Sequence, residues 1–175
     1  NVFAATEGSS PAGFSVERLQ QMSLLTARIA KQIMSDPKEA ETAFTAGLLH
    51  DIGKIILVLT APEKFSAAIA GAAESGRPGY ELEREMLGAS HAEVGGFLLG
   101  VWGLPLPIVE AVAYHHVLPA TPRPRMDTVL GIHVASALAG QVLAAQAGAP
   151  VQDHLDLVAL EAAGVTGELP RWREV

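Results

Sequence analysis

Apolar residues along this chain recur at helical rather than strand spacing. After Ser15, four of them follow at the three-, four- and seven-residue steps that place side chains on one face of a helix. They are Leu19, Met22, Ile29 and Ile33. No segment shows the regular alternation of apolar and polar residues that predicts a half-buried strand. The pattern therefore predicts an all-α fold.

A second helix is predicted to begin at Asp36 and to run to about Leu59. Asp36 has the side chain of a good N-cap, and Pro37 stands at the first helical position, where a backbone N–H would be unpaired in any case. Gly47 and Gly53 lie within this helix, although each glycine costs about 1 kcal/mol relative to alanine in a helix interior. Close packing against another helix or a local kink would explain both glycines.

Further helices are predicted downstream, separated by glycine and proline. Thr60 and Glu63 have the spacing of a capping box and predict a helix start, and Ser90 and Glu93 have the same spacing. A short acidic helix is expected to end at Gly88. A long alanine-rich helix follows a proline-rich loop, and the tail of the chain is expected to hold one short helix and a loose end.

Composition narrows the class of protein. Of the 175 residues, 49% are apolar and 18% are charged, as in a globular domain. The net charge of −7 argues against general nucleic-acid binding and against an anionic membrane surface. No uninterrupted apolar run approaches the roughly 20 residues of a membrane span. The chain has no cysteine, so we expect a cytoplasmic location, and any metal site must use histidine and carboxylate ligands.

Histidines gather at the ends and kinks of the predicted helices. His50 and Asp51 are adjacent on the second helix, about 100° apart around its axis. His91 begins a later helix, and His115 and His116 end the next one. These positions allow the side chains to converge where several helices meet. Imidazoles with a carboxylate suit one divalent metal ion, namely Zn, Fe, Mn or Ni.

The same residues also have purely structural interpretations, which the pattern leaves open. His50 and Asp51 can form a buried hydrogen-bonded pair that connects helices. The three other histidines of the set can cap helices and bond within the core. Lys54, one turn after His50, is a candidate for phosphate binding or else a solvated charge at a helix end.

Four further residues and an acidic run have simpler expected roles. Trp102 is expected to anchor the core, and His133 is expected to be structural. The acidic run after Tyr80 is expected to be a solvated face, and Tyr80 and Leu87 beside it are a candidate docking patch for a partner protein.

Three segments of the chain carry a family resemblance: "AFTAGLLHDIGK", "LGASHAEVGGFLLGVWGLPLPIVEAVAYHH" and "LGIHVASALA". Their layout resembles the HD superfamily and, more closely, the HDOD group (HD-related output domain) of bacterial signalling proteins. The resemblance covers residues 15–146 and implies an HD-domain-like helical bundle there, between a leader or loop over residues 1–14 and a tail over 147–175. Full HDOD domains carry another helical segment before the equivalent of Phe14, so we expect this chain to be the C-terminal part of one or a variant with another front end.

The resemblance also implies which metal ligands remain. Catalytic HD phosphohydrolases hold one metal with a His on an early helix, the HD pair and an Asp on a late helix. The early His falls at Met22 and the late Asp at Ser136, so both are lost. HD-GYP relatives hold a second metal with the bridging Asp, a further His and a His-His pair. That second set is still present as Asp51, His91, His115 and His116, although the GYP segment is missing.

The resemblance thus implies a non-catalytic or degenerate output module of signal transduction. Such a module would bind a protein partner or small ligand and receive its signal from an upstream sensor domain, or from a receiver domain as in response regulators. Two-metal hydrolysis needs ions roughly 3.5–4 Å apart, which the two lost ligands argue against. The alternative is a metal-dependent phosphohydrolase that uses the remaining His and Asp residues.

Overall fold

The computed structural model describes residues 12–120, 125–149, 151 and 154–174, which form helices joined by turns. No strand occurs in this described part, so the predicted all-α class is confirmed. The α-helices are α1 Val16–Ile33, α2 Pro37–Leu49, α3 Ile52–Thr60, α4 Pro62–Ser75, α5 Gly79–Leu87, α6 His91–Val101, α7 Leu106–Tyr114, α8 Thr128–Gln146, α9 Leu157–Ala162 and α10 Leu169–Trp172. Most of the expected leader over residues 1–14 lies outside the described residues.

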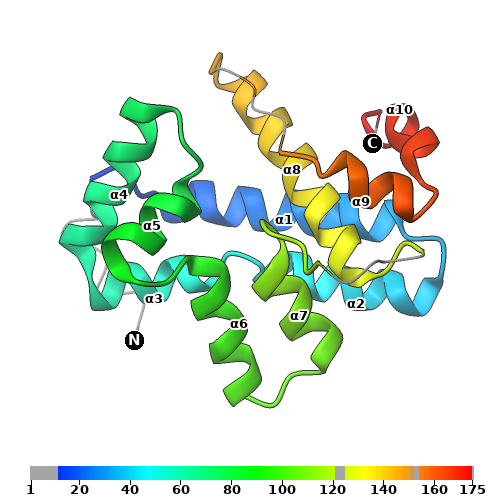
Figure 1. Ribbon diagram of the computed structural model, residues 1–175, viewed down its shortest axis with the longest axis horizontal. Helices are drawn as coiled ribbons and strands as arrows, with labels where there is room; N and C mark the ends of the chain where they lie inside the picture. The colour runs from blue at the N-terminus through cyan, green and yellow to red at the C-terminus, as the bar shows by residue number, and fades with distance from the viewer. Residues whose placement is uncertain (1–11, 121–124, 150, 152–153, 175) are drawn as a thin grey trace.

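Helix α8 is the centre of the larger hydrophobic core. Every residue from Thr128 to Ser136 is buried, because α1, α2 and α7 all pack against this helix. Figure 1 shows α8 crossing α1, with α9 and α10 beside them. Leu160 of α9 and Trp172 of α10 are buried in the same core. The tail therefore holds more ordered structure than the single short helix and loose end that we predicted.

A smaller hydrophobic cluster lies among α3, α4 and α5. Phe65 of α4 is 2% exposed and packs with two residues of α3, and Phe14 meets it edge-on at a ring separation of 6.0 Å. Ile69 and Leu87 cover this cluster. Leu87 is thus half-buried against this cluster, and its part in a docking patch stays a prediction.

Several predicted helix boundaries are confirmed by their caps. Asp36 accepts hydrogen bonds from two backbone N–H groups of the first turn of α2, both at 2.9 Å. Ser90 and Glu93 form a complete capping box at the start of α6. Gly88 ends α5 in the left-handed conformation, at φ 87°.

The predicted capping box at Thr60 is wrong. Thr60 is the last residue of α3, and its hydroxyl donates a hydrogen bond to the carbonyl oxygen of Ile56 at 2.7 Å. Helix α4 begins at Pro62 without a side-chain cap. Thr60 therefore bonds backwards into its own helix, which the spacing to Glu63 does not reveal.

The helix predicted from Asp36 to Leu59 is two helices. Its backbone is interrupted at His50 and Asp51, which lie between the end of α2 and the start of α3. Both kinking and close packing are present here. A Cβ atom at Gly47 would lie 2.6 Å from the Cα atom of Ala27 in α1, and one at Gly53 would overlap a backbone carbonyl oxygen of α6.

Two helical stretches have the length and composition of a membrane span, although no uninterrupted apolar run in the sequence does. They are Pro37–Thr60, which combines α2 and α3, and α8. Within each stretch the most apolar 18-residue segment is partly buried in this fold. The buried share of that segment is 61% in α8 and 44% in Pro37–Thr60. Core helices of globular proteins pass the same test, so length and composition are weak grounds for a membrane assignment.

The prediction that Trp102 anchors the core is wrong. Trp102 is 61% exposed at the end of α6, and Phe97, Val101 and Leu106 near it are exposed as well. Figure 1 shows why: the turn between α6 and α7 projects away from the rest of the bundle. Leu104 of the same turn packs against the main core in its place.

Candidate metal centre

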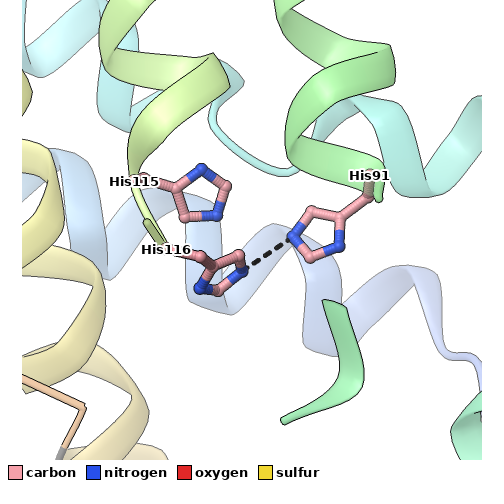
Figure 2. A group of neighbouring side chains, drawn as sticks. All are labelled: His91, His115 and His116. Carbon is pink, nitrogen blue, oxygen red and sulfur yellow. Dashed lines mark hydrogen bonds between the residues drawn. The ribbon is translucent and has the colours of Figure 1, made fainter. Parts of the chain in front are cut away.

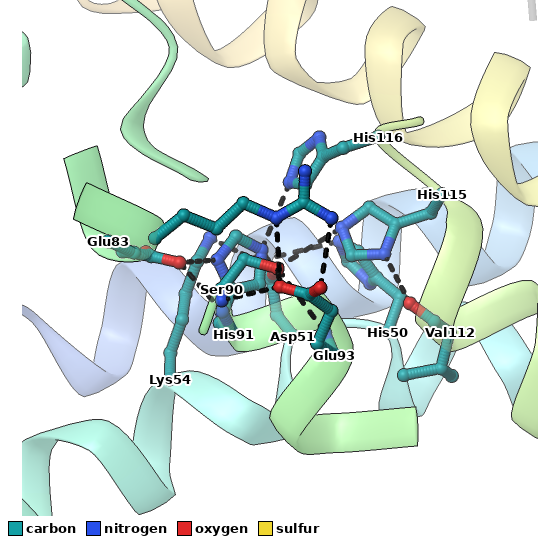
Figure 3. Close-up of polar contacts among 11 residues, drawn as sticks. His50, Asp51, Lys54, Glu83, Ser90, His91, Glu93, Val112, His115 and His116 are labelled. Atoms are coloured by element: carbon teal, nitrogen blue, oxygen red, sulfur yellow. Dashed lines mark hydrogen bonds and ion pairs between the residues drawn. The ribbon is translucent and has the colours of Figure 1, made fainter. Parts of the chain in front are cut away.

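The structure brings together all five residues that the sequence proposed as metal ligands. His50 and Asp51 come from the break between α2 and α3, His91 is the first residue of α6, and His115 and His116 follow the end of α7. Four of the five are no more than 2% exposed, and His116 is partly buried. We call these five residues the metal centre (Figure 3).

The three imidazoles from α6 and α7 face one another, as Figure 2 shows. One ring nitrogen from each of His91, His115 and His116 lies within 4.8 Å of the other two. The Nε2 atoms of His91 and His116 are 3.0 Å apart. Ligand nitrogens around a tetrahedral zinc ion, with bonds of 2.0–2.1 Å, stand roughly 3.3 Å apart, so this spacing is close to that of a metal site.

Asp51 connects these imidazoles to His50. His50, Asp51 and His115 form a second group whose ligand atoms lie within 4.8 Å of one another. Oδ2 of Asp51 is 3.5 Å from Nε2 of His50, and Oδ1 is 3.1 Å from Nε2 of His91. The carboxylate is therefore placed to share one ion with the three imidazoles.

Two buried polar atoms of the centre support this interpretation. Within the part of the chain that the structure describes, Nε2 of His115 makes no hydrogen bond, and Oδ1 of Asp51 gains one, from Nε2 of His91 at 3.1 Å, only when that ring nitrogen carries a proton. Oδ1 of Asp51 and Nε2 of His115 are 3.9 Å apart. An unsatisfied buried polar atom costs about 1–3 kcal/mol, and an ion between these two atoms would satisfy both. The residues present thus fit one divalent ion.

Outer contacts fix the orientation of two imidazoles. Nδ1 of His50 donates a hydrogen bond to the carbonyl oxygen of Gly47, and Nδ1 of His115 donates to that of Val112, each at 2.8 Å. These donors leave the lone pair of Nε2 on each neutral ring for the centre. Metal-bound histidines commonly have their second nitrogen held in this way.

Glu83 orients His91, and sequence reasoning missed it. Its carboxylate is 4% exposed and accepts hydrogen bonds from Nδ1 of His91 at 2.6 Å and from the His91 backbone N–H at 2.7 Å. Tyr80, one turn earlier on α5, stacks on His116 with ring centres 4.6 Å apart. The acidic run is therefore not a wholly solvated face, and Tyr80 points inward. The 80, 83, 87 spacing on α5 was the signal that marks its buried face.

The surroundings favour the protonation states that bind metal, namely an ionised Asp51 and neutral His115 and His116. Burial raises the pKa of Asp51, but its interactions with His50, Lys54 and His91 outweigh burial and hold this pKa well below its usual value. Burial, followed by the neighbouring imidazoles, lowers the pKa of His115 and His116 well below the usual range. An ionised carboxylate and neutral imidazoles are the forms that bind metal.

His91 differs from the other imidazoles. Burial and the charge of Lys54 lower its pKa, but hydrogen bonds to Asp51 and Glu83 raise it, and the net pKa lies above the usual value. Two carboxylates therefore favour a cation at this ring, either a proton or a metal ion beside Nε2. Binding of a metal would release that proton.

Lys54 lies at the centre and is not a freely solvated charge. Its Nζ donates a hydrogen bond to Oδ2 of Asp51 at 2.7 Å, and its side chain is 29% exposed. An ammonium group has three donors, so at least one remains for a ligand. A phosphate contact of Lys54 stays a prediction.

One side of the centre has few ligand groups of its own, namely His50 and, from the tail, His154. A cavity of about 300 Å³ is lined by His50, Asp51 and His115, and also by Met22 of α1 and Ser136 of α8. The Ser136 hydroxyl donates to a backbone carbonyl oxygen of its own helix at 3.1 Å. The two positions where the family resemblance puts lost ligands thus border the same cavity, which we call the ligand-poor side.

His133 has the structural role that we predicted. Its Nδ1 donates to the carbonyl oxygen of His115 at 2.9 Å, and its Nε2 accepts from the backbone N–H of Asp156 at 2.9 Å. Burial lowers its pKa, which keeps the ring neutral as this bonding requires. Both nitrogens are occupied, so the structure offers no free nitrogen of His133 to a metal.

Comparison with known proteins gives a family match. The family model described as HDOD domain matches residues 1–118. An uncharacterised protein of Treponema pallidum (strain Nichols) is 32% identical over 90 residues, which are 50% of this chain and 18% of that protein. The expected domain limits at residues 14 and 146 stay predictions.

Solved structures share the fold. An HDOD domain protein from Geobacter sulfurreducens matches with a TM-score of 0.67 and 20% identity over 99% of this chain and 64% of its own. The MmoQ response regulator from Methylococcus capsulatus matches with a TM-score of 0.63 and 26% identity over 94% of this chain and 64% of its own. The chain therefore spans less than two thirds of the length of these relatives.

Proposed function

Because the chain belongs to the HDOD family, we propose that it is a non-catalytic signal-transduction output module in a bacterial cytoplasm. In this proposal one divalent ion, Zn, Fe, Mn or Ni, organises the metal centre, and a small ligand or a signalling protein partner binds the module. The similarity to the MmoQ response regulator supports a signalling role. The net charge of −7 supports neither nucleic acid nor an anionic membrane as a partner.

The observation that carries the proposal is the ligand-poor side. Met22 and Ser136 border the cavity beside His50 and Asp51, where a second ion would need ligands. A thioether and a hydroxyl are poor ligands for hard divalent ions. Two-metal phosphoester hydrolysis needs a second ion about 3.5–4 Å from the first, so this side of the centre argues against it.

The ion would add a link between elements that already pack against one another, since α6 packs against both α3 and α7, and α2 packs against α7. Its ligands come from the α2–α3 break, from α6 and from the end of α7, and Glu83 adds α5 through His91. An ion that binds the folded chain more tightly than the unfolded chain stabilises this arrangement. We therefore assign the ion a structural role that prepares the module for its ligand or partner.

The proposal of an upstream signalling domain is supported by the greater length of the solved relatives. The solved relatives are longer than this chain, which spans 64% of two of them. An upstream receiver or sensor domain supplies the signal in our proposal, and the helical module passes it on.

A metal-dependent phosphohydrolase is the second candidate. It is favoured by Asp51, His91, His115 and His116, which together offer one ion a carboxylate and three imidazoles, with Lys54 beside them. A bound divalent ion would supply Lewis-acid activation of water and of the phosphoryl oxygen.

Turnover by the purified protein separates the two candidates. The wild-type chain and a His91→Ala variant are incubated with p-nitrophenyl phosphate and bis(p-nitrophenyl) phosphate in the presence of Mn, Fe, Ni or Zn. We expect equal, background rates from both proteins. Turnover by the wild type that is lost in His91→Ala, while the variant keeps its melting temperature, would refute the non-catalytic role.

A further inference from the structure

A second cavity, of about 380 Å³, adjoins the metal centre and is not explained by ion binding. It shares Asp51, His91 and His116 with the centre and extends away from it between α1, α4 and α5. Pockets for small molecules enclose roughly 300–1,000 Å³, so this cavity has the size for a small ligand. We call it the amphipathic cavity, because its walls differ in polarity.

One wall of the amphipathic cavity is apolar. It is formed by Phe14, by Leu19 and Met22 of α1, by Ile69 of α4 and by Leu143 of α8. Met22 stands where the resemblance puts a metal-binding His. A methionine at this position therefore has two effects: it leaves the centre without an imidazole, and it enlarges the apolar wall of the neighbouring cavity.

The polar part of the lining favours an anion. Arg18 on α1 lines the cavity, is exposed, and makes no ion pair with any residue that the structure describes. Lys54 gives one hydrogen bond to Asp51 and keeps other donors. Asp51 and Glu83 are the carboxylates of this lining, and both are buried and already bonded to Lys54 or His91. The accessible charges are therefore cationic.

We propose that the amphipathic cavity binds a small organic anion with an apolar body. Its phosphate-type or carboxylate group contacts Arg18 and Lys54, and its apolar body covers the wall formed by Leu19, Met22 and Ile69. Arginine pairs with both kinds of anion through two parallel hydrogen bonds. The proposal rests on the proposed function, since it names the ligand class that a non-catalytic module would sense.

Hexylphosphonate is the probe, because its P–C bond resists hydrolysis. Calorimetric titration of the wild-type protein compares it with inorganic phosphate, which lacks the apolar body, and with 1-hexanol, which lacks the charge. We expect hexylphosphonate to bind at least about tenfold more tightly than either one, because it makes both kinds of contact. Binding of hexylphosphonate no tighter than that of inorganic phosphate would overturn the proposal.

Matched variants of α1 locate the binding. Arg18→Gln should weaken hexylphosphonate about tenfold and leave 1-hexanol unchanged, while Arg28→Gln, an exposed arginine outside the cavity lining, should change neither. Leu19→Ser should weaken both probes, whereas Leu24→Ser, on the exposed face at 42% exposure, should weaken neither. Melting temperatures confirm that each variant is folded.

The outcomes also separate this inference from the function on which it rests. If Arg18→Gln and Arg28→Gln behave alike, the cavity assignment is wrong, while the absence of turnover would still support a signalling module. If the protein instead hydrolyses phosphoesters, the proposed function fails even where hexylphosphonate binds.

Discussion

The two sides of the metal centre share Asp51 and His115 but differ in the ligands that surround them. On the side of α6 and α7, three imidazoles converge with ring nitrogens within 4.8 Å of one another, and Glu83 orients one of them. On the ligand-poor side, Met22 and Ser136 border an open cavity beside His50. One side has the donors and outer contacts of an ion site, and the other has His50, with His154 of the tail also lining its cavity.

This contrast shows that a metal site and a hydrolytic site have different requirements. A single ion needs a few donors with oriented lone pairs, which the α6–α7 side supplies. Hydrolysis by two ions needs donors on both sides of the bridging carboxylate. In our proposal, loss of ligands on one side removes the hydrolytic chemistry while the other side still holds an ion.

The largest expected effect comes from removing an imidazole on the α6–α7 side. His91→Ala should weaken metal binding by more than about 100-fold. Loss of a residue that only orients a metal ligand already lowers metal affinity roughly 10–100-fold, and loss of the ligand itself should cost more. His50→Ala should weaken it less than about tenfold if the ion lies on the α6–α7 side. Elemental analysis and competition with a chelator measure both. Equal losses in the two variants would show that the ion is shared evenly between the sides.

Glu83→Gln should have the next largest effect. The amide still accepts the backbone N–H of His91, but it loses the charge that holds Nδ1 of that ring, so metal affinity should fall roughly 10–100-fold. Glu81→Gln is the matched control, since Glu81 lies on the same helix and pairs with Arg77 at the surface. The same chelator competition applies. If both variants bind the metal like the wild type, Glu83 has no orienting role.

Restoring ligands on the ligand-poor side should add an ion. In the double variant Met22→His and Ser136→Asp, the bound metal should rise from about one to about two ions per chain, because a His and a carboxylate complete a set with His50 and Asp51. The single variants are the controls and should stay near one ion. A stoichiometry that does not change in the double variant would mean that the helices α1 and α8 hold these positions too far from Asp51.

The smallest expected effect concerns Glu93, which lies in the first turn of α6 but is not one of the five residues of the metal centre. Hydrogen bonds from Arg84 and from Ser90 lower the pKa of Glu93 to about 2 from a usual value of 4.5. A lowered folded-state pKa gives stability above pH ~4.5 that is lost as the pH falls toward ~2. Glu93 is 42% exposed, so the stabilisation should be about 0.2–1 kcal/mol.

Urea unfolding of Glu93→Gln between pH 7 and pH 2 tests this. The variant should be less stable than the wild type at pH 7 and equal to it near pH 2, because Gln cannot titrate. Glu63→Gln, at an exposed glutamate of α4, should show no such convergence. A difference that stays constant with pH would point to the cap geometry and not to the charge.

Much of this arrangement could be predicted from the sequence because it depends on local signals. Asp36, Ser90 and Gly88 mark helix ends by their own chemistry, and the structure confirms them. Convergence of the His and Asp residues was also predictable, because they lie at helix ends and at glycine-flanked positions. The helix break at His50 and Asp51 was only half predicted, since the glycines indicate kinking or packing without saying which.

The rest depends on contacts between distant residues. Glu83 lies in an acidic run that looks solvated, and its role depends on α5 packing beside the first turn of α6. Trp102 is apolar and was expected inside, but the α6–α7 turn carries it away from the core. The burial of Trp172 depends on the path of the tail over α8. The local sequence pattern does not indicate how such distant segments pack against one another.

His133, an imidazole outside the metal centre, connects the centre to the tail of the chain by hydrogen bonds. His133 receives nothing from the ion, yet its two nitrogens bond on one side to the backbone of His115 and on the other to the backbone of Asp156. A shift of the last turn of α7 when a ligand docks would therefore be transmitted through a rigid five-membered ring to the entrance of α9. The same ring makes the far end of the chain a natural place to look, by hydrogen exchange, for the first sign that the module has been switched.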